Sequence, residues 1–92
     1  MIKRLVIEGL VQGVGYRVSL ANKAKTLGIE GWVRNRRDGS VEACVVGKEE
    51  AIEALIIWSR GGPPSARVLN VHISDSTESA PLTGQFNVLP TV

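Results

Sequence analysis

Cysteine, histidine and aromatic residues are scarce in this sequence, which has one Cys, one His, two Trp, one Tyr and one Phe among 92 residues. Cys44 alone cannot form an intramolecular disulfide or a cysteine-based metal cluster. Together with His72 it still falls short of the three or four ligands that a metal site uses. We therefore expect no metal and no cofactor, and we interpret Cys44 as a bystander thiol and His72 as a solvated strand residue.

Long apolar runs are also missing, because no stretch approaches the ~20 apolar residues of a membrane-spanning helix. Met1–Arg4 lead directly into a strand-like pattern, without the apolar segment of a secretion signal. The absence of a disulfide framework suits a reducing compartment. These features predict a cytoplasmic protein with no membrane association.

No charge of one sign dominates, since 11 basic residues face 9 acidic ones and the formal net charge is only +2. This balance suits a small anionic ligand better than nucleic acid. A chain of 92 residues forms one domain, here residues 1–92, and buries roughly 60–65% of its unfolded surface. Such a small, uninterrupted fold without internal repeats favours a monomer.

Alternation of apolar and polar residues predicts strands at 2–9, 29–36, 40–46, 67–74 and 85–89. In the fourth of these strands, Leu69, Val71 and Ile73 are expected on one face. Arg37-Asp38-Gly39 predicts a hairpin turn between the second and third strands, because Asp-Gly supplies the positive φ of tight turns. The Ser/Thr/Pro-rich stretch 75–83 is interpreted as a loop.

Two helices are predicted between these strands, at 17–27 and 49–60. The first carries Leu20, Ala24 and Leu27 on one stripe and ends at Gly28. The resulting order is β-α-β-β-α-β with an extra short C-terminal strand. It predicts an α+β, ferredoxin-like split β-α-β sandwich, with two helices on one face of an antiparallel sheet.

The segment between the first strand and the first helix, residues 9–16, is called the glycine loop below. Glycines at 9, 13 and 15 allow successive N–H groups to turn inward, and the helix N-terminus adds about half a positive charge. Arg17 follows on the stripe of Leu20, where its guanidinium can grip two phosphate oxygens. The same pattern also fits an ordinary glycine-rich connection followed by a surface arginine. Without Gly-Lys-Ser/Thr, no nucleotide is implied.

Asn35 lies at the end of the second strand and alternates with Val33, so both are expected in the layer that contains Arg17. Its amide oxygen can hold a water while its NH₂ donates to a phosphate oxygen. An asparagine that stabilises the hairpin is the alternative interpretation. The neighbouring basic residues form a patch that either steers anions or is simply a solvated edge; they are Arg34, Arg36 and Arg37.

Five segments occur in a familiar order: V-Q-G-V-G-Y-R at 11–17, G-W-V-R-N at 31–35, D-G-S-V-E at 38–42, G-P-P-S-A-R-V at 62–68, and the late Phe86. Together they resemble the acylphosphatase family over nearly the whole chain. Leu10 departs from the pattern, where the family usually has Arg. Tyr16 is a milder departure, where Phe is more frequent.

This resemblance implies a metal-independent hydrolase that splits the carboxyl–phosphate bond of acyl phosphates. It implies that Asn35 positions the attacking water and that the phosphate is bound by the amides of the glycine loop and by Arg17. The residues assigned to phosphate binding are Val11, Gln12, Gly13, Val14, Gly15, Tyr16 and Arg17. A non-catalytic acylphosphatase-like anion-binding module is the alternative. RNA binding on a ferredoxin-like sheet is disfavoured because the chain has only four aromatic residues, too few for a platform on which bases could stack.

Overall fold

The computed structural model describes residues 1–76 and 84–92, which form five strands and two helices. The elements are β1 (Ile2–Leu10), α1 (Tyr16–Thr26), β2 (Glu30–Asn35), β3 (Val41–Val46), α2 (Glu49–Ser59), β4 (Arg67–Asp75) and β5 (Phe86–Val88). Most of the loop predicted at 75–83 lies outside the described residues. Neither helix is long and apolar enough to span a membrane within the described part of the chain.

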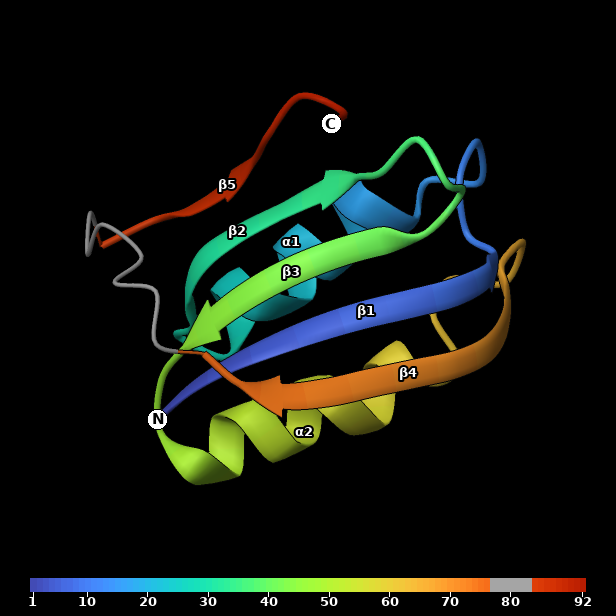
Figure 1. Cartoon of the computed structure of the whole chain (residues 1–92). Coiled ribbons are helices and arrows are strands. Elements are labelled where there is room, and N and C mark those ends of the chain that lie inside the picture. The colour runs from blue at the N-terminus through green and yellow to red at the C-terminus, as the bar shows by residue number, and fades with distance from the viewer. Residues whose placement is uncertain (77–83) are drawn as a thin grey trace.

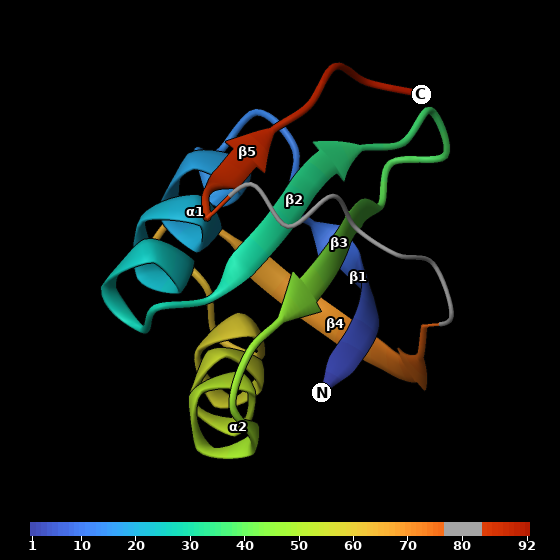
Figure 2. The ribbon, with the colours of Figure 1, turned by 90° about the vertical axis from the view of Figure 1, so that its left-hand side faces the viewer.

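The strands form one sheet in the order β4-β1-β3-β2-β5 (Figure 1). The pairs β1–β4, β1–β3 and β2–β3 are antiparallel, whereas β5 pairs parallel to β2 and makes the sheet mixed. Both helices pack on the same face of the sheet (Figure 2). The predicted ferredoxin-like α+β fold is confirmed, with the expected C-terminal strand added at the β2 edge.

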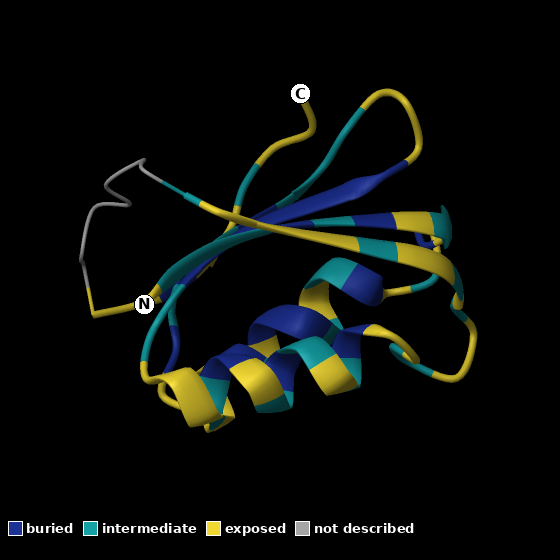
Figure 3. Ribbon diagram, turned by 60° about the horizontal axis from the view of Figure 1, so that its bottom comes forward, coloured by how far each residue is buried: buried dark blue, intermediate teal, exposed yellow. Residues whose placement is uncertain are grey.

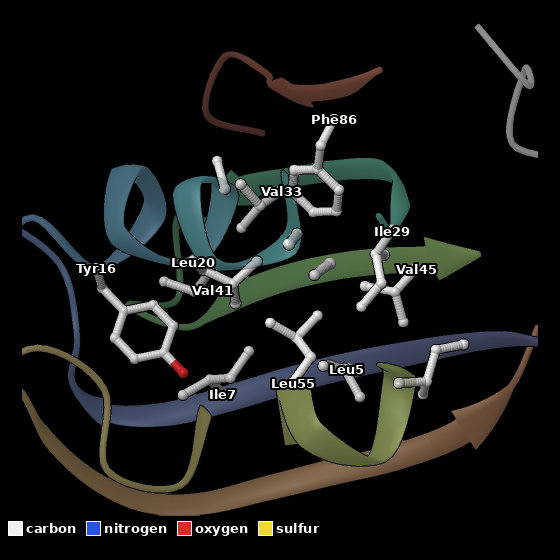
Figure 4. Close-up of a cluster of buried hydrophobic side chains, with 14 of the residues drawn as sticks. Leu5, Ile7, Tyr16, Leu20, Ile29, Val33, Val41, Val45, Leu55 and Phe86 are labelled. Carbon is white, nitrogen blue, oxygen red and sulfur yellow. The ribbon is translucent and has the colours of Figure 1, made fainter. Parts of the chain in front are cut away.

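The hydrophobic core lies between this face of the sheet and the helices. It contains Leu5 and Ile7 of β1, Leu20 of α1 and Leu55 of α2 (Figure 4). Figure 3 shows that each helix carries buried residues along one side and exposed residues along the other. The alternating strand pattern and the helical stripes therefore meet in a single apolar layer.

The predicted inner face of β4 is wrong at Leu69. Leu69 is 77% exposed, which shows that it does not share the inner face with Val71. Val68 packs against the core instead, together with Val71. Ile73 is also partly exposed, at 38%.

A β-bulge explains the change of face. Glu8 of β1 pairs with Asn70, but the next residue, Gly9, pairs with Val68, so Leu69 has no partner opposite it. An extra residue in one strand shifts the period-two alternation by one position. Gly9 makes this possible with a φ of 130°, and a Cβ there would lie 2.2 Å from the carbonyl oxygen of Arg67.

Tyr16 connects the two helices inside the core. It is the first residue of α1, and its buried hydroxyl donates a hydrogen bond of 2.7 Å to the carbonyl oxygen of Ser59 in α2. Its ring lies 5.7 Å from that of Trp58, centroid to centroid. Burial raises the pKa of the Tyr16 phenol well above its ordinary value, and the bond to Ser59 opposes this only in part. The hydroxyl therefore remains a donor at all ordinary pH values.

Replacing Tyr16 by Phe tests this contact. The ring and its packing remain, while a buried carbonyl near the end of α2 loses its donor, so Tyr16→Phe should lower the free energy of unfolding by about 1 kcal/mol. Urea denaturation monitored by circular dichroism measures the difference. An unchanged unfolding midpoint would show that the hydrogen bond contributes nothing net.

The outer face of the sheet is organised around Glu42, whose side chain is only 7% exposed. Arg4 Nε donates to one of its carboxylate oxygens at 2.6 Å, and Arg34 Nε donates to the other at 2.8 Å. The Arg34 guanidinium also lies 4.4 Å from the centre of the Trp32 ring. Arg34 thus belongs to this face and not to a basic patch beside Asn35.

The Glu42 cluster makes stability depend on pH. Burial alone raises the pKa of the Glu42 carboxyl, but the hydrogen bonds from Arg34 and Arg4 outweigh it and hold the pKa below its ordinary value. A carboxyl with a lowered folded-state pKa stabilises the fold above its unfolded pKa of ~4.3, and this contribution disappears as the pH falls through the folded pKa.

We expect Glu42→Gln to lower the free energy of unfolding by about 1–2 kcal/mol at pH 7, because two guanidinium groups lose their counter-charge but can still reach water. The difference between Glu42→Gln and the parent chain should shrink in urea denaturation series taken from pH 7 to pH 3. A difference that stays constant over that range would contradict the proposed role of the ionised carboxylate.

Candidate active site

The glycine loop, the β2–β3 hairpin and the C-terminal residues meet at one end of the sheet (Figure 1). A cavity of about 120 Å³ lies there, between the start of α1 and the end of β2. It is lined by Val11, Gly13, Gly15, Tyr16, Arg17, Val18 and Asn35. The two residues expected to do the chemistry, Arg17 and Asn35, therefore share one cavity although they come from different elements.

The backbone of the glycine loop leaves its donors available. Gly13 and Gly15 have positive φ values of 75° and 79°, and no other residue type has positive φ in the described part of the chain. Residues with negative and positive φ thus alternate along the loop, a geometry in which successive N–H groups form a concave anion site. Among the described residues, no N–H group from Gly13 to Val18 donates to another backbone group.

Helix α1 has no cap of its own. Gly15 occupies the N-cap position, where no side chain accepts a hydrogen bond, and the first turn contains no acidic residue. The first N–H groups of a helix need an outside acceptor, and the helix dipole makes that end positive. An anion in the cavity would satisfy both requirements.

Arg17 adds a full positive charge to this site. Its Nη1 donates a long hydrogen bond of 3.4 Å to the carbonyl oxygen of Leu89, which follows β5. No carboxylate of the described residues lies within ion-pair distance of it. The guanidinium is therefore held at the cavity by one neutral contact and retains donors for a ligand.

Asn35 contributes an acceptor without a partner. Its Oδ1 is buried, and no described residue donates to it. The hairpin is closed by other groups: the Arg36 N–H donates to Ser40 O at 2.9 Å, and Asp38 accepts from the N–H and the hydroxyl of Ser40. An unpaired buried acceptor costs about 1–3 kcal/mol, so the geometry favours a ligand or water at Oδ1 over the hairpin-stabilising interpretation.

Not every predicted loop residue lines the cavity. The Val14 side chain packs against the core, and the Gln12 side chain donates to the hairpin. Val18, which was not predicted, lines the cavity and is 58% exposed. The signal for Val18 was available, because the first three N–H groups of any helix lack internal acceptors. It was missed because the binding residues were taken from the segment that carries the resemblance, residues 11–17, which ends one residue before Val18.

The other reactive side chains lie elsewhere. His72 contacts Glu8 on β1, and Cys44 is buried in β3. The described residues contain no group of three His, Cys, Asp or Glu side chains that could hold a metal ion. Arg36 is engaged with Asp38 at 3.9 Å.

The chain is similar to known proteins over most of its length. The Acylphosphatase family model matches residues 3–88. A protein of Thiobacillus denitrificans named acylphosphatase is 54% identical over 72 residues, which cover 78% of this chain and 81% of the relative. One from Azoarcus sp. is 49% identical over 88 residues, covering 95% of this chain and 87% of the relative.

Solved structures agree with the sequence comparison. The crystal structure of acylphosphatase from Bacillus subtilis has a TM-score of 0.88 and 31% identity, and the match covers 97% of this chain and 99% of that one. An acylphosphatase structure from Coxiella burnetii also has a TM-score of 0.88, at 34% identity over 96% of this chain and 90% of that one. The family match and these relatives together show that the chain belongs to the acylphosphatase family.

Proposed function

We propose that this chain hydrolyses acyl phosphates to a carboxylate and inorganic phosphate, with the phosphate bound by Arg17 and the glycine loop and the water positioned by Asn35. One observation carries the proposal. Arg17, Asn35 and most residues of the 13–18 segment line the same cavity. Among the described residues, the Arg17 guanidinium has no carboxylate partner, the N–H groups of residues 13–18 have no backbone acceptor, and the buried Oδ1 of Asn35 has no donor. A tetrahedral phosphate with a water beside it provides the acceptors and the donor that these groups lack.

The groups proposed to bind the phosphate would also stabilise the negative charge of the transition state. During phosphoryl transfer, charge spreads over the three equatorial oxygens. The N–H groups from Gly13 to Val18 and the Arg17 guanidinium are fixed by the loop and the helix before substrate arrives. Such preorganised donors need no reorganisation during the reaction, which is why they lower its barrier.

Asn35 is proposed to position the attacking water. Its Oδ1 accepts a hydrogen bond from the water, which leaves an oxygen lone pair of the water free to face phosphorus. The amide nitrogen of Asn35 can donate to a phosphate oxygen at the same time. Holding the water and the phosphate in one geometry removes much of the entropic cost of bringing them together.

The reaction then needs no acid from the protein. The water oxygen forms a bond to phosphorus as the bond from phosphorus to the acyl oxygen breaks, and the acyl oxygen leaves with the bonding electrons as a carboxylate. Its conjugate acid has a pKa near ~4, so departure requires no proton. The proton of the water passes to a phosphate oxygen of the substrate. Arg17 and the loop amides supply the charge stabilisation, so we propose a metal-independent reaction.

We further propose that residues 1–92 act as one domain and as a cytoplasmic monomer on small molecules. The single apolar core supports one domain. Binding of nucleic acid is disfavoured by the outer sheet face, where Arg34 covers the Trp32 ring that would otherwise be available for base stacking.

An assay with benzoyl phosphate separates the enzyme from a non-catalytic anion-binding module. We expect phosphate release in the presence of EDTA, with competitive inhibition by inorganic phosphate. Oxygen-18 from labelled water should enter the phosphate and not the benzoate, because the attack is at phosphorus. Tight phosphate binding without turnover would favour the module and contradict the proposal.

Arg17→Ala should nearly abolish both phosphate binding and turnover. Removing one preorganised donor commonly costs ~10²–10³ in rate, and a charged group that can make two hydrogen bonds should cost at least as much. Steady-state kinetics and inhibition by inorganic phosphate measure the two effects. Arg60→Ala is the matched control, since its side chain is exposed and lines no part of this cavity. Near-normal hydrolysis by Arg17→Ala would refute the mechanism.

Asn35→Ala should behave differently, because it removes the water ligand and leaves the phosphate site in place. We expect kcat to fall by about 10²-fold while the inhibition constant of phosphate changes by less than about threefold. Asn70→Ala, an exposed asparagine on β4, serves as the control. Equal losses in kcat and in phosphate affinity would assign Asn35 to phosphate binding and not to the water.

A further inference from the structure

The side chain of Gln12 bridges two parts of the site that are far apart in sequence. Its Nε2 donates a hydrogen bond of 2.7 Å to the carbonyl oxygen of Arg36 and another of 2.9 Å to the carbonyl oxygen of Ser40. These carbonyls flank the turn of the β2–β3 hairpin, one directly after β2 and one directly before β3. Both N–H donors of the Gln12 amide are thereby used, so none remains for a ligand.

The two acceptors are already part of the closed hairpin. The Arg36 carbonyl also accepts from the Gly39 N–H at 3.1 Å, and the Ser40 carbonyl accepts from the Arg36 N–H at 2.9 Å. Gln12 therefore joins the glycine loop to a preformed hairpin and does not build that hairpin. Its side chain is partly buried, and Gln12 is not among the residues that line the cavity.

The Gln12 bridge lies next to two residues that line the cavity. Gln12 directly precedes Gly13, the first of the positive-φ loop residues that line the cavity, and Arg36 directly follows Asn35. The bridge therefore fixes the loop that faces the phosphate relative to the strand end that carries Asn35. A catalytic group displaced by about 1 Å can cost up to ~10² in rate.

We propose that Gln12 is a positioning residue for the hydrolysis: its side chain sets the placement of Asn35 relative to the bound phosphate and does not itself contact substrate. This inference rests on the proposed function, because it assigns Gln12 an effect through Asn35. It differs from the role implied by the family resemblance, which is a phosphate contact through the backbone amide of the loop.

Gln12→Met tests the proposal, because it keeps the length and volume of the side chain and removes both donors. We expect kcat for benzoyl phosphate to fall about tenfold, while the inhibition constant of inorganic phosphate changes less than about threefold. Gln85→Met is the matched control, an exposed glutamine that lines no part of this cavity, and it should leave both values unchanged.

A double-mutant cycle separates positioning from general stabilisation. If Gln12 acts through Asn35, Gln12→Met should lower kcat about tenfold in the parent chain but less than about twofold in the Asn35→Ala background. Gln12→Asn is a second variant for the same cycle, because it keeps the amide but is too short to reach both carbonyls. Near-ultraviolet circular dichroism confirms that each variant is folded before its kinetics are measured.

Three outcomes would overturn the inference. An equal loss of kcat in both backgrounds would show a purely structural role, and a raised inhibition constant of phosphate would show that the side chain serves phosphate binding. Unchanged kinetics in a folded Gln12→Met would show that the bridge is dispensable. By contrast, if Asn35→Ala itself left kcat unchanged, the proposed function of Asn35 would fail, independently of Gln12.

Discussion

The uncapped start of α1 is the constraint on which the site depends. Gly15 occupies the N-cap position of α1 and offers no capping side chain, so the first N–H groups of the helix find no backbone acceptor among the described residues, and its positive dipole end lacks a counter-charge there. The alternation of φ through Gly13 and Gly15 gathers these donors on the wall of one small cavity. Arg17 adds charge at the same place, and no carboxylate of residues 1–76 or 84–92 forms an ion pair with it. We propose that a phosphate group binds to these donors, and that the same donors stabilise the transition state of phosphoryl transfer.

Contacts elsewhere in the fold fix the positions of these donors. Tyr16 anchors the first residue of α1 to α2 through Ser59. The β-bulge at Leu69 of β4 lies opposite the step from Glu8 to Gly9, where the glycine loop begins within the end of β1. The Gln12 bridge connects that loop to the hairpin next to Asn35. The Glu42 cluster uses the opposite face of the sheet and stabilises the strands without competing for the anion. The Glu42 ion pairs and the candidate anion site therefore lie on different faces of one sheet.

Apolar residues that recur every two or every 3.6 positions predicted the strands and the helices. The same patterns predicted that Arg17 and Asn35 lie in one layer, because strand alternation and the helical stripe are local repeats. Other features depend on contacts between distant segments, which no local pattern encodes. Alternation placed Leu69 inward, but one extra residue in β4 reverses its face. Arg34 was grouped with its sequence neighbours, whereas the sheet pairs it with Glu42. The buried Oδ1 of Asn35 likewise lacks a donor because other groups close the hairpin, which the strand pattern does not encode.

The central claim is that phosphate binds to the N–H groups at the start of α1. A ¹H–¹⁵N NMR titration with inorganic phosphate tests it most directly, because each backbone amide reports separately. We expect the largest shifts, and protection from hydrogen exchange at saturation, at residues 13–18, with the side-chain signals of Arg17 and Asn35 changing at the same phosphate concentration. Saturable shifts centred elsewhere, with the amides of residues 13–18 unaffected, would contradict it.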